Sequence, residues 1–170
     1  LAKMDEEEAA AQSGAARPVL EEVDLSDVLE GELLQFESVA FERNIELESD
    51  VDEGIAVQGS IERLRRLVTT LLDNACKYAG DNGKVRVELH AQDGGARFFV
   101  HNTGSLISAE DLQHVFDRFY RADKARTSGA GGFGLGLSIA KEVAEEHGGT
   151  ITAKSSDEEG TTFTATLPIA

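Results

Sequence analysis

The sequence predicts an α+β fold in which helices pack on one face of a mixed, largely antiparallel sheet, making a two-layer α/β sandwich. Two stretches, 84–101 and 150–167, each contain two alternating segments around turn residues, the pattern of a β-hairpin. Helical periodicities flank these hairpins, and the clearest covers 61–79. Hairpins interleaved with helices are typical of helices packed on a single sheet face. The length of 170 residues suits one domain with a short appendage.

The first 22 residues differ in composition from the rest and are predicted to be an acidic linker. Leu1–Asp5 has the character of the end of a longer helix. An acidic run and then Ala, Ser, Gly and Pro continue to Pro18, a composition that suits a tether more than a packed element. We therefore expect the folded domain to cover 23–170.

The first elements of that domain are a helix and two short strands. An amphipathic helix is expected from a cap at Asp24 or Ser26 to about Asn44. The alternating residues 45–48 predict a strand, with a short partner at 55–58.

The second half contains the better-defined patterns. The helix at 61–79 has an apolar residue at every third or fourth position. After it we expect, in order, strands at 84–90 and 96–101, a helix from a cap at Ser108 to Phe119, a Gly/Ser-rich loop at 127–134, a helix from Leu135 to His147, and strands at 150–155 and 161–167.

The net charge excludes several classes of partner. There are 16 basic and 32 acidic residues, a net charge of −16, which opposes binding to nucleic acid or to an anionic membrane surface. No apolar run approaches the roughly 20 residues of a membrane span. The single cysteine, Cys76, excludes an internal disulfide and suits a reducing compartment, and the four histidines have no zinc-type spacing.

The negative charge is concentrated in one half of the chain. Residues 1–60 hold 3 basic and 17 acidic side chains, a net of −14, and residues 61–170 hold 13 and 15, a net of −2. The second half is therefore close to neutral and does not oppose an anionic small ligand.

A polar strip borders the apolar stripe of the helix at 61–79. Thr70, Asn74 and Lys77 fall within roughly 60° of one another at 3.6 residues per turn, and Tyr78 lies beside them. An amide oxygen suits Mg²⁺, a lysine suits phosphate, and a tyrosine ring can lie against a planar group. An ordinary solvated helix boundary would show the same pattern.

Two glycine clusters are candidates for close backbone approach to a ligand. The run 129–137 leads directly into a helix, whose free N–H groups favour an anion. No strand immediately precedes it and no Gly-Lys-Ser/Thr follows, so neither a Rossmann nor a Walker loop is predicted. Asn102 and Gly104 follow a strand, where Asn102 could bond a base edge or simply form a turn.

Together these segments resemble the sensor histidine kinases. Residues 71–78, Leu-Leu-Asp-Asn-Ala-Cys-Lys-Tyr, resemble their N box, and 116–121, Phe-Asp-Arg-Phe-Tyr-Arg, resemble their F box. Residues 132–140, Gly-Phe-Gly-Leu-Gly-Leu-Ser-Ile-Ala, resemble their second glycine box. The order and spacing match over about 20–170. The resemblance implies the Bergerat fold and the catalytic, ATP-binding domain of a two-component kinase.

The resemblance also implies site residues, cofactors and roles. Mg²⁺ would be held by Asn74, the phosphates would meet Lys77 and Arg126, and these three are the implied catalytic residues. Tyr78 would lie on the adenine. The implied nucleotide-binding residues are Asn74, Lys77, Tyr78, Asn102, Gly104, Ile107, Phe116, Gly132, Gly134, Leu135, Gly136 and Leu137.

Three departures from the family pattern qualify that expectation. Asn102 stands where an Asp usually reads the adenine amino group, and Leu106 replaces the second glycine of the first glycine box. Asn102 can still accept a hydrogen bond, without charge. Thr70 stands where a second Asn, or in related ATPases a glutamate base, is usual, which disfavours simple hydrolysis.

The expected function is therefore transfer of the ATP γ-phosphoryl group to a histidine of a dimerisation domain, for relay to a response regulator. None of the four histidines has the family's phosphoacceptor context, so this chain alone should not phosphorylate itself. The resemblance implies a cytoplasmic domain of a membrane-anchored bacterial sensor kinase, a homodimer at full length, without direct membrane contact by this domain. The alternatives are a non-transferring ATPase, an anti-sigma serine kinase, which the F box opposes, and a nucleotide-binding relic that acts as an interaction module.

Overall fold

The computed structural model describes residues 20–104, 106–118 and 134–170. Its strands form a five-stranded sheet of order β2-β4-β5-β7-β6 and a separate β1-β3 pair. The strands are β1 (Glu21–Asp24), β2 (Glu46–Val51), β3 (Ala56–Gly59), β4 (Lys84–Gln92), β5 (Gly95–Asn102), β6 (Thr150–Ser156) and β7 (Gly160–Pro168). The helices are α2 (Leu25–Glu42), α3 (Ile61–Ala79), α4 (Ala109–Leu112) and α6 (Gly134–Glu146).

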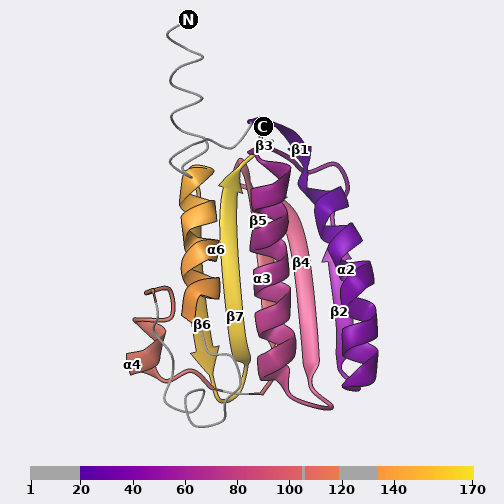
Figure 1. Cartoon of the computed structure of the whole chain (residues 1–170), viewed down its shortest axis with the longest axis vertical. Coiled ribbons are helices and arrows are strands. Elements are labelled where there is room, and N and C mark those ends of the chain that lie inside the picture. The colour runs from indigo at the N-terminus through magenta and orange to yellow at the C-terminus, as the bar shows by residue number, and fades with distance from the viewer. Residues whose placement is uncertain (1–19, 105, 119–133) are drawn as a thin grey trace, which may run out of the picture.

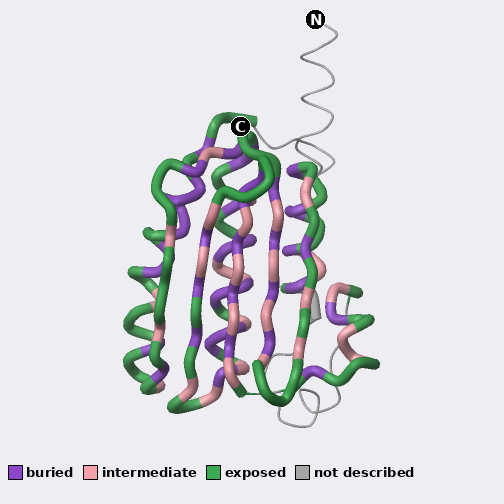
Figure 2. Tube along the Cα trace, turned by 180° about the vertical axis from the view of Figure 1, so that it is seen from behind, coloured by how far each residue is buried: buried purple, intermediate pink, exposed green. Residues whose placement is uncertain are grey.

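Helices α2, α3 and α6 lie side by side on one face of the five-stranded sheet, which confirms the predicted two-layer sandwich (Figure 1). The helices pack there because each has an apolar stripe; α3 fully buries Leu64, Leu67 and Leu71. Phe98 of β5 and Phe163 of β7 fill the facing side of the core. Seen from the other side, buried positions alternate with more exposed ones along the central strands, as expected for a sheet covered on one face (Figure 2).

One prediction about strand pairing is wrong. The segment 55–58 does not pair with the preceding strand: β3 pairs antiparallel with β1, and β2 pairs parallel with β4, which makes the sheet mixed. Ser26 explains the separation, because its hydroxyl donates to the carbonyl of Asp52 at 2.5 Å and accepts from the N–H of Ile55 at 3.1 Å. The start of α2 thus bonds one backbone group on each side of the β2–β3 connection.

The strand β1 also begins earlier than the sequence pattern suggested. It starts at Glu21, two residues before the expected beginning of the ordered domain. Asp24 then caps α2, because its carboxylate accepts from the N–H of Asp27 at 3.0 Å. Of the two predicted caps, Asp24 is the correct one, and Ser26 is a buried residue of the first turn.

The predicted central hairpin is confirmed, with strands slightly longer than expected. β4 and β5 are joined by the two residues Asp93 and Gly94, whose φ angles are 54° and 76°. Two consecutive positive φ values match the twist of the strands in a two-residue hairpin, and Asp-Gly is a favoured pair for such a turn.

The helix expected from Ser108 to Phe119 is wrong beyond its first turn. Ser108 caps it as predicted, but α4 ends at Leu112 and the backbone continues in short turns. These turns bury Val115 completely and set the ring of Phe116 edge-on to that of Phe163, with centroids 6.1 Å apart.

No helix within the described residues is long and apolar enough to span a membrane. The remaining elements follow the sequence pattern closely. Helix α3 has the predicted bounds, and α6 ends near the predicted glycine pair, with Gly148 at φ 76°.

Candidate functional site

The described members of the predicted site lie at one end of the sandwich, where α3 and β5 end and where α6 and β7 begin (Figure 1). Three elements distant in sequence therefore meet there: the N box helix, the strand that precedes the first glycine box, and the helix that follows the second one. Arg126 and Gly132 lie outside the described residues, and Leu135 is described as a backbone position in α6.

The polar strip of α3 borders the start of α6. Asn74 is half-buried, and Lys77 is exposed with its ammonium 3.1 Å from the Asp73 carboxylate. A Cβ added to Gly136 would lie 3.6 Å from the methyl group of Thr70, one turn before Asn74. Since α6 begins at Gly134, the positive end of its dipole lies beside this strip.

Asn102 is the most distinctive polar side chain of the site. It is completely buried at the end of β5, and its amide nitrogen donates to the carbonyl of Thr103 at 2.8 Å. Its amide oxygen is buried without a hydrogen-bond partner among the described residues. An unpaired buried acceptor costs about 1–3 kcal/mol, and native structures rarely leave one without a reason. A donor from a bound ligand would remove that cost.

Gly104 brings the backbone into contact with the end of α3. Its φ is 103°, and a Cβ there would lie 2.4 Å from the Tyr78 carbonyl oxygen and 2.9 Å from that of Ala79. Only glycine fits such an approach. The backbone that follows Asn102 is thereby held against the last carbonyl groups of α3, and the Tyr78 side chain packs against the core.

Sequence reasoning missed two hydroxyl groups at the edge of this site. Thr161 lies opposite Asn102 in the β5–β7 ladder and is buried, and its hydroxyl is 2.8 Å from that of Ser155. Ser155 in turn accepts from the N–H of Ile107 at 2.9 Å, which anchors that predicted residue. The sequence does contain a signal for Thr161. In the alternating pattern of β7 it is a polar residue on the same, buried face as Phe163.

Two other predicted residues belong mainly to the hydrophobic core. Leu137 of α6 is 1% exposed, and Phe116 packs on Phe163. Such side chains support the walls of a site and contribute no polar contact. The polar groups of the described site that the sequence predicted are thus those of Asn74, Lys77 and Asn102, with the start of α6 beside them.

This set of groups fits a nucleotide and a hard cation. An amide oxygen on α3 is a ligand type that Mg²⁺ accepts, a lysine beside a helix N-terminus suits phosphate, and a buried amide acceptor suits an exocyclic amino group. No thiol competes for the cation, because Cys76 is buried and faces the core, and burial raises the pKa of its thiol, against a smaller opposing effect of Arg43.

Comparison with known proteins assigns the chain to a family. Residues 59–170 match the family described as histidine kinase-, DNA gyrase B- and HSP90-like ATPase. The chain belongs to this ATPase family. The match covers every described site residue. Because the family is one of ATPases, the nucleotide expected at this site is ATP. The Bergerat fold expected from the sequence is that of the solved relatives.

Within this ATPase family the chain is similar to sensor histidine kinases. It is 39% identical over 145 residues to the sensor histidine kinase YkoH of Bacillus subtilis, which is 85% of this chain and 31% of that protein. The mycobacterial sensor histidine kinase MprB has a structure with 33% identity and a TM-score of 0.75, covering 89% of this chain and 98% of that one. Full-length ShkA in complex with AMPPNP gives 27% identity and a TM-score of 0.78, covering 94% of this chain and 34% of that one.

The extent of these matches defines what the chain corresponds to. It spans between 18% and 31% of the length of the curated sensor proteins it matches, but nearly the whole of the MprB structure. The chain thus has the sequence and fold of the ATP-binding catalytic domain of a sensor histidine kinase.

Proposed function

We propose that this domain binds Mg-ATP and presents its γ-phosphoryl group to a histidine of a dimerisation domain. The observation that carries the proposal is the buried, unpartnered amide oxygen of Asn102 at the end of β5. The adenine amino group is a donor of the kind this oxygen lacks. The bond from the Asn102 amide nitrogen to Thr103 supports the orientation in which the oxygen faces the ligand.

The residues of α3 supply the remaining contacts. Asn74 would hold Mg²⁺ through its amide oxygen, and a bound Mg²⁺ would neutralise charge on the phosphates. Lys77 has to leave Asp73 to meet a phosphate. That exchange is cheap, because an exposed ion pair contributes only about 0–1 kcal/mol and both side chains are about half exposed. Arg126 and the glycines 132, 134 and 136 remain proposed phosphate contacts on the family pattern.

Transfer is proposed over hydrolysis because Thr70 replaces the general base that hydrolysing relatives carry at this position of the helix. Thr70 occupies the position of the glutamate found in hydrolysing relatives, and its methyl group lies against the start of α6. A hydroxyl cannot activate water as a carboxylate does. The acceptor histidine would come from a dimerisation domain, and the phosphoryl group would pass to a response regulator.

The wider assignment rests on the same similarity. Residues 1–22 are proposed to be the end of a dimerisation-domain helix with an acidic linker, and 23–170 the catalytic domain, whose structure includes β1 from Glu21. We assign the full-length protein to the membrane-anchored bacterial sensor kinases, as a homodimer with this domain in the cytoplasm.

Calorimetric titration with Mg-ATP tests the proposal directly. The chain should bind one nucleotide, the ATP analogue AMPPNP should compete, as expected from its presence in the ShkA complex, and Asn74→Ala should weaken binding at least about tenfold. Arg66→Ala, an exposed change on another part of the same helix, is the matched control. Absence of binding by the parent chain would overturn the proposal. Equal binding by the parent and Asn74→Ala would remove Asn74 from the site.

A second experiment tests transfer. The full-length protein with labelled ATP should acquire acid-labile, base-stable phosphate, as expected for phosphohistidine, and the isolated chain should not. Nucleotide binding without any such phosphate at full length would favour a binding module over a kinase.

A further inference from the structure

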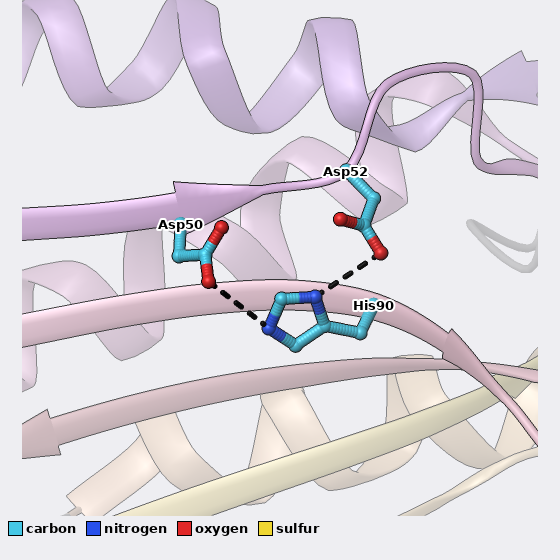
Figure 3. Close-up of side chains that lie close together, drawn as sticks. All are labelled: Asp50, Asp52 and His90. Atoms are coloured by element: carbon cyan, nitrogen blue, oxygen red, sulfur yellow. Dashed lines mark hydrogen bonds and ion pairs between the residues drawn. The ribbon is translucent and has the colours of Figure 1, made fainter.

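A second polar cluster lies on the other side of the sheet, at its far end. His90 of β4 projects between Asp50 of β2 and Asp52, one residue beyond that strand (Figure 3). Its Nδ1 is 3.1 Å from an Asp52 carboxylate oxygen, and its Nε2 is 3.7 Å from an Asp50 carboxylate oxygen. One donor atom from each residue lies within 4.8 Å of the other two. One nitrogen and two carboxylate oxygens therefore lie close together on the surface, with the two carboxylates facing different nitrogens of the ring.

The backbone that carries these side chains is fixed on both sides. β2 and β4 pair in parallel register, with Asp50 opposite Glu88. Asp52 extends the ladder, because its N–H donates to Leu89 at 2.9 Å, and its carbonyl accepts from the buried Ser26 hydroxyl. Rotation of the side chains alone could therefore bring the three metal-ligand atoms closer together, without a change in the backbone.

The charge balance of the cluster is incomplete. In the described part of the chain, Asp50 and Asp52 have no cationic partner other than His90. Arg86 is shared between Glu48 and Glu88, and Arg97, opposite His90 in the β4–β5 ladder, pairs with Asp93.

The cluster offers ligand atoms of the types that zinc accepts, at separations that small side-chain rotations can close. Donors around a tetrahedral zinc ion, at bonds of about 2.0–2.2 Å, lie roughly 3.4 Å apart. Asp52 already lies 3.1 Å from Nδ1, whereas Asp50 faces the other ring nitrogen at 3.7 Å and would turn toward Nδ1 to share an ion with Asp52. When Nδ1 binds the ion, Nε2–H faces Glu88 at 3.2 Å, the carboxylate partner that metal-bound histidines usually have.

We propose that Asp50, Asp52 and His90 form a binding site for one divalent transition-metal ion of the zinc class. An imidazole nitrogen with two carboxylate oxygens favours such an ion over Mg²⁺ or Ca²⁺, which prefer oxygen ligands alone. The three side chains are 29–55% exposed, so the ion would enter from solvent and retain at least one water.

This site is separate from the proposed nucleotide site. His90 lies six positions along β4 from Lys84, which is beside the end of β5, and six positions span about 20 Å at 3.3 Å per residue. His90 also lies on the sheet face opposite the helices, since the buried positions of β4 alternate with it. Ion binding would join β2, an edge strand, to β4, and so stabilise the domain without touching the nucleotide.

Zinc titration of the metal-stripped full chain tests the proposal. Calorimetry in a non-chelating buffer should show one Zn²⁺ per chain, a rise in the melting temperature, and no competition from excess Mg²⁺. His90→Gln and Asp52→Asn should each weaken Zn²⁺ binding at least about tenfold. His101→Gln is the matched control, because His101 lies on the same sheet face but its Nδ1 meets the Thr162 hydroxyl at 2.9 Å.

Two results would overturn the site: no stoichiometric Zn²⁺ binding, or binding that survives both His90→Gln and Asp52→Asn. Circular dichroism of the metal-free variants verifies folding, and Asp50→Asn replaces any variant that fails to fold. Mg-ATP binding should be the same for the parent and His90→Gln, so that failure of the nucleotide proposal would be recognised separately.

Discussion

At the scale of single residues, Asn102 determines how the proposed site would read a base. A neutral amide oxygen accepts one hydrogen bond from an amino group, whereas a carboxylate would make a charge-assisted one. Because the Asn102 oxygen is buried, leaving it without a hydrogen bond raises the free energy of the unliganded chain. A ligand donor that bonds this oxygen would therefore strengthen binding. Base selectivity should therefore depend on this side chain more than on any other described group.

Inosine triphosphate offers a direct test, because it carries a carbonyl where adenine carries the amino group. The parent chain should bind ATP roughly 3–10-fold more tightly than ITP, as one net hydrogen bond of about 0.5–1.5 kcal/mol allows. Asn102→Leu should lower ATP affinity to near that of ITP and abolish the difference. Titration of both nucleotides on both proteins measures it. A preference that survives in Asn102→Leu would place base recognition elsewhere.

Cys76 gives a second residue-scale prediction, about pH. Burial raises the pKa of its thiol in the folded chain above the ordinary value of about 8.5. As pH rises past the unfolded value, the unfolded chain loses its proton first, so this group favours folding below that pH and its contribution declines above it. The free energy of unfolding should fall between pH 7 and pH 10 more steeply for the parent than for Cys76→Ala.

Thiol modification checks the same environment by an independent route. The folded chain should react slowly with a disulfide reagent such as DTNB at pH 8, and one thiol should react rapidly in urea. Fast reaction of the folded chain would mean that Cys76 is accessible, contrary to its burial.

At the scale of elements, α6 is attached to the start of α3 through a buried histidine. The ring of His147 donates from Nδ1 to the Val143 carbonyl at 2.7 Å and accepts at Nε2 from the N–H of Ser60 at 3.2 Å. Both partners are backbone groups, so together they fix a neutral tautomer. Ser60 also caps α3, and thus one side chain connects two helices of the core layer.

Gly59 shows how tightly this junction is packed. A Cβ at this position would lie 2.2 Å from the His147 ring, so Gly59→Ala should destabilise the chain by about 1–3 kcal/mol. Gly31→Ala is the matched control: nothing lies within 4 Å, and alanine in a helix interior should stabilise by about 0.5–1 kcal/mol. Urea unfolding of the three proteins compares them. Equal stability of Gly59→Ala and the parent would contradict this packing.

The elements that the sequence predicted well are those whose conformation depends on residues close together in the sequence. Periodicity gave the bounds of α3, and the Asp93–Gly94 turn identified the central hairpin, because both depend on neighbouring residues. The pairing of β3 with β1 and the early end of α4 depend on tertiary contacts, namely the insertion of Ser26 and the burial of Val115. No pattern within those segments could reveal them.

The candidate site divides in the same way. The motif residues Asn74, Lys77 and Asn102 are recognisable because their spacing is a feature of the sequence. The Thr161–Ser155 pair and the cluster around His90 are formed only by strand register, which brings together residues from separate strands. Register is determined by the whole sheet and cannot be read from any one strand.

At the scale of the whole molecule, the uneven charge should make stability depend on salt. Helix α2 and strand β2 together carry eight acidic and no basic side chains, whereas residues 61–170 have a net charge of only −2, so α2 and β2 form an acidic edge beside a near-neutral body. Lys84 and Arg86 of β4 offset part of this charge through pairs with Glu46 and Glu48 of β2. These pairs are about half exposed and each stabilises by only about 0–1 kcal/mol, so repulsion within the acidic edge should dominate.

Screening that repulsion should stabilise the fold. Between about 0.01 M and 0.1 M salt the Debye length falls from about 30 Å to about 10 Å. At the higher salt concentration, charges on opposite sides of the domain no longer interact appreciably. The urea midpoint should therefore rise with NaCl over this range at constant m-value, and KCl should act alike. Urea is the appropriate denaturant because guanidinium would itself screen the charges. A midpoint that falls with salt would show instead that the cross-strand ion pairs outweigh the repulsion, and that the acidic edge is stabilised by β4.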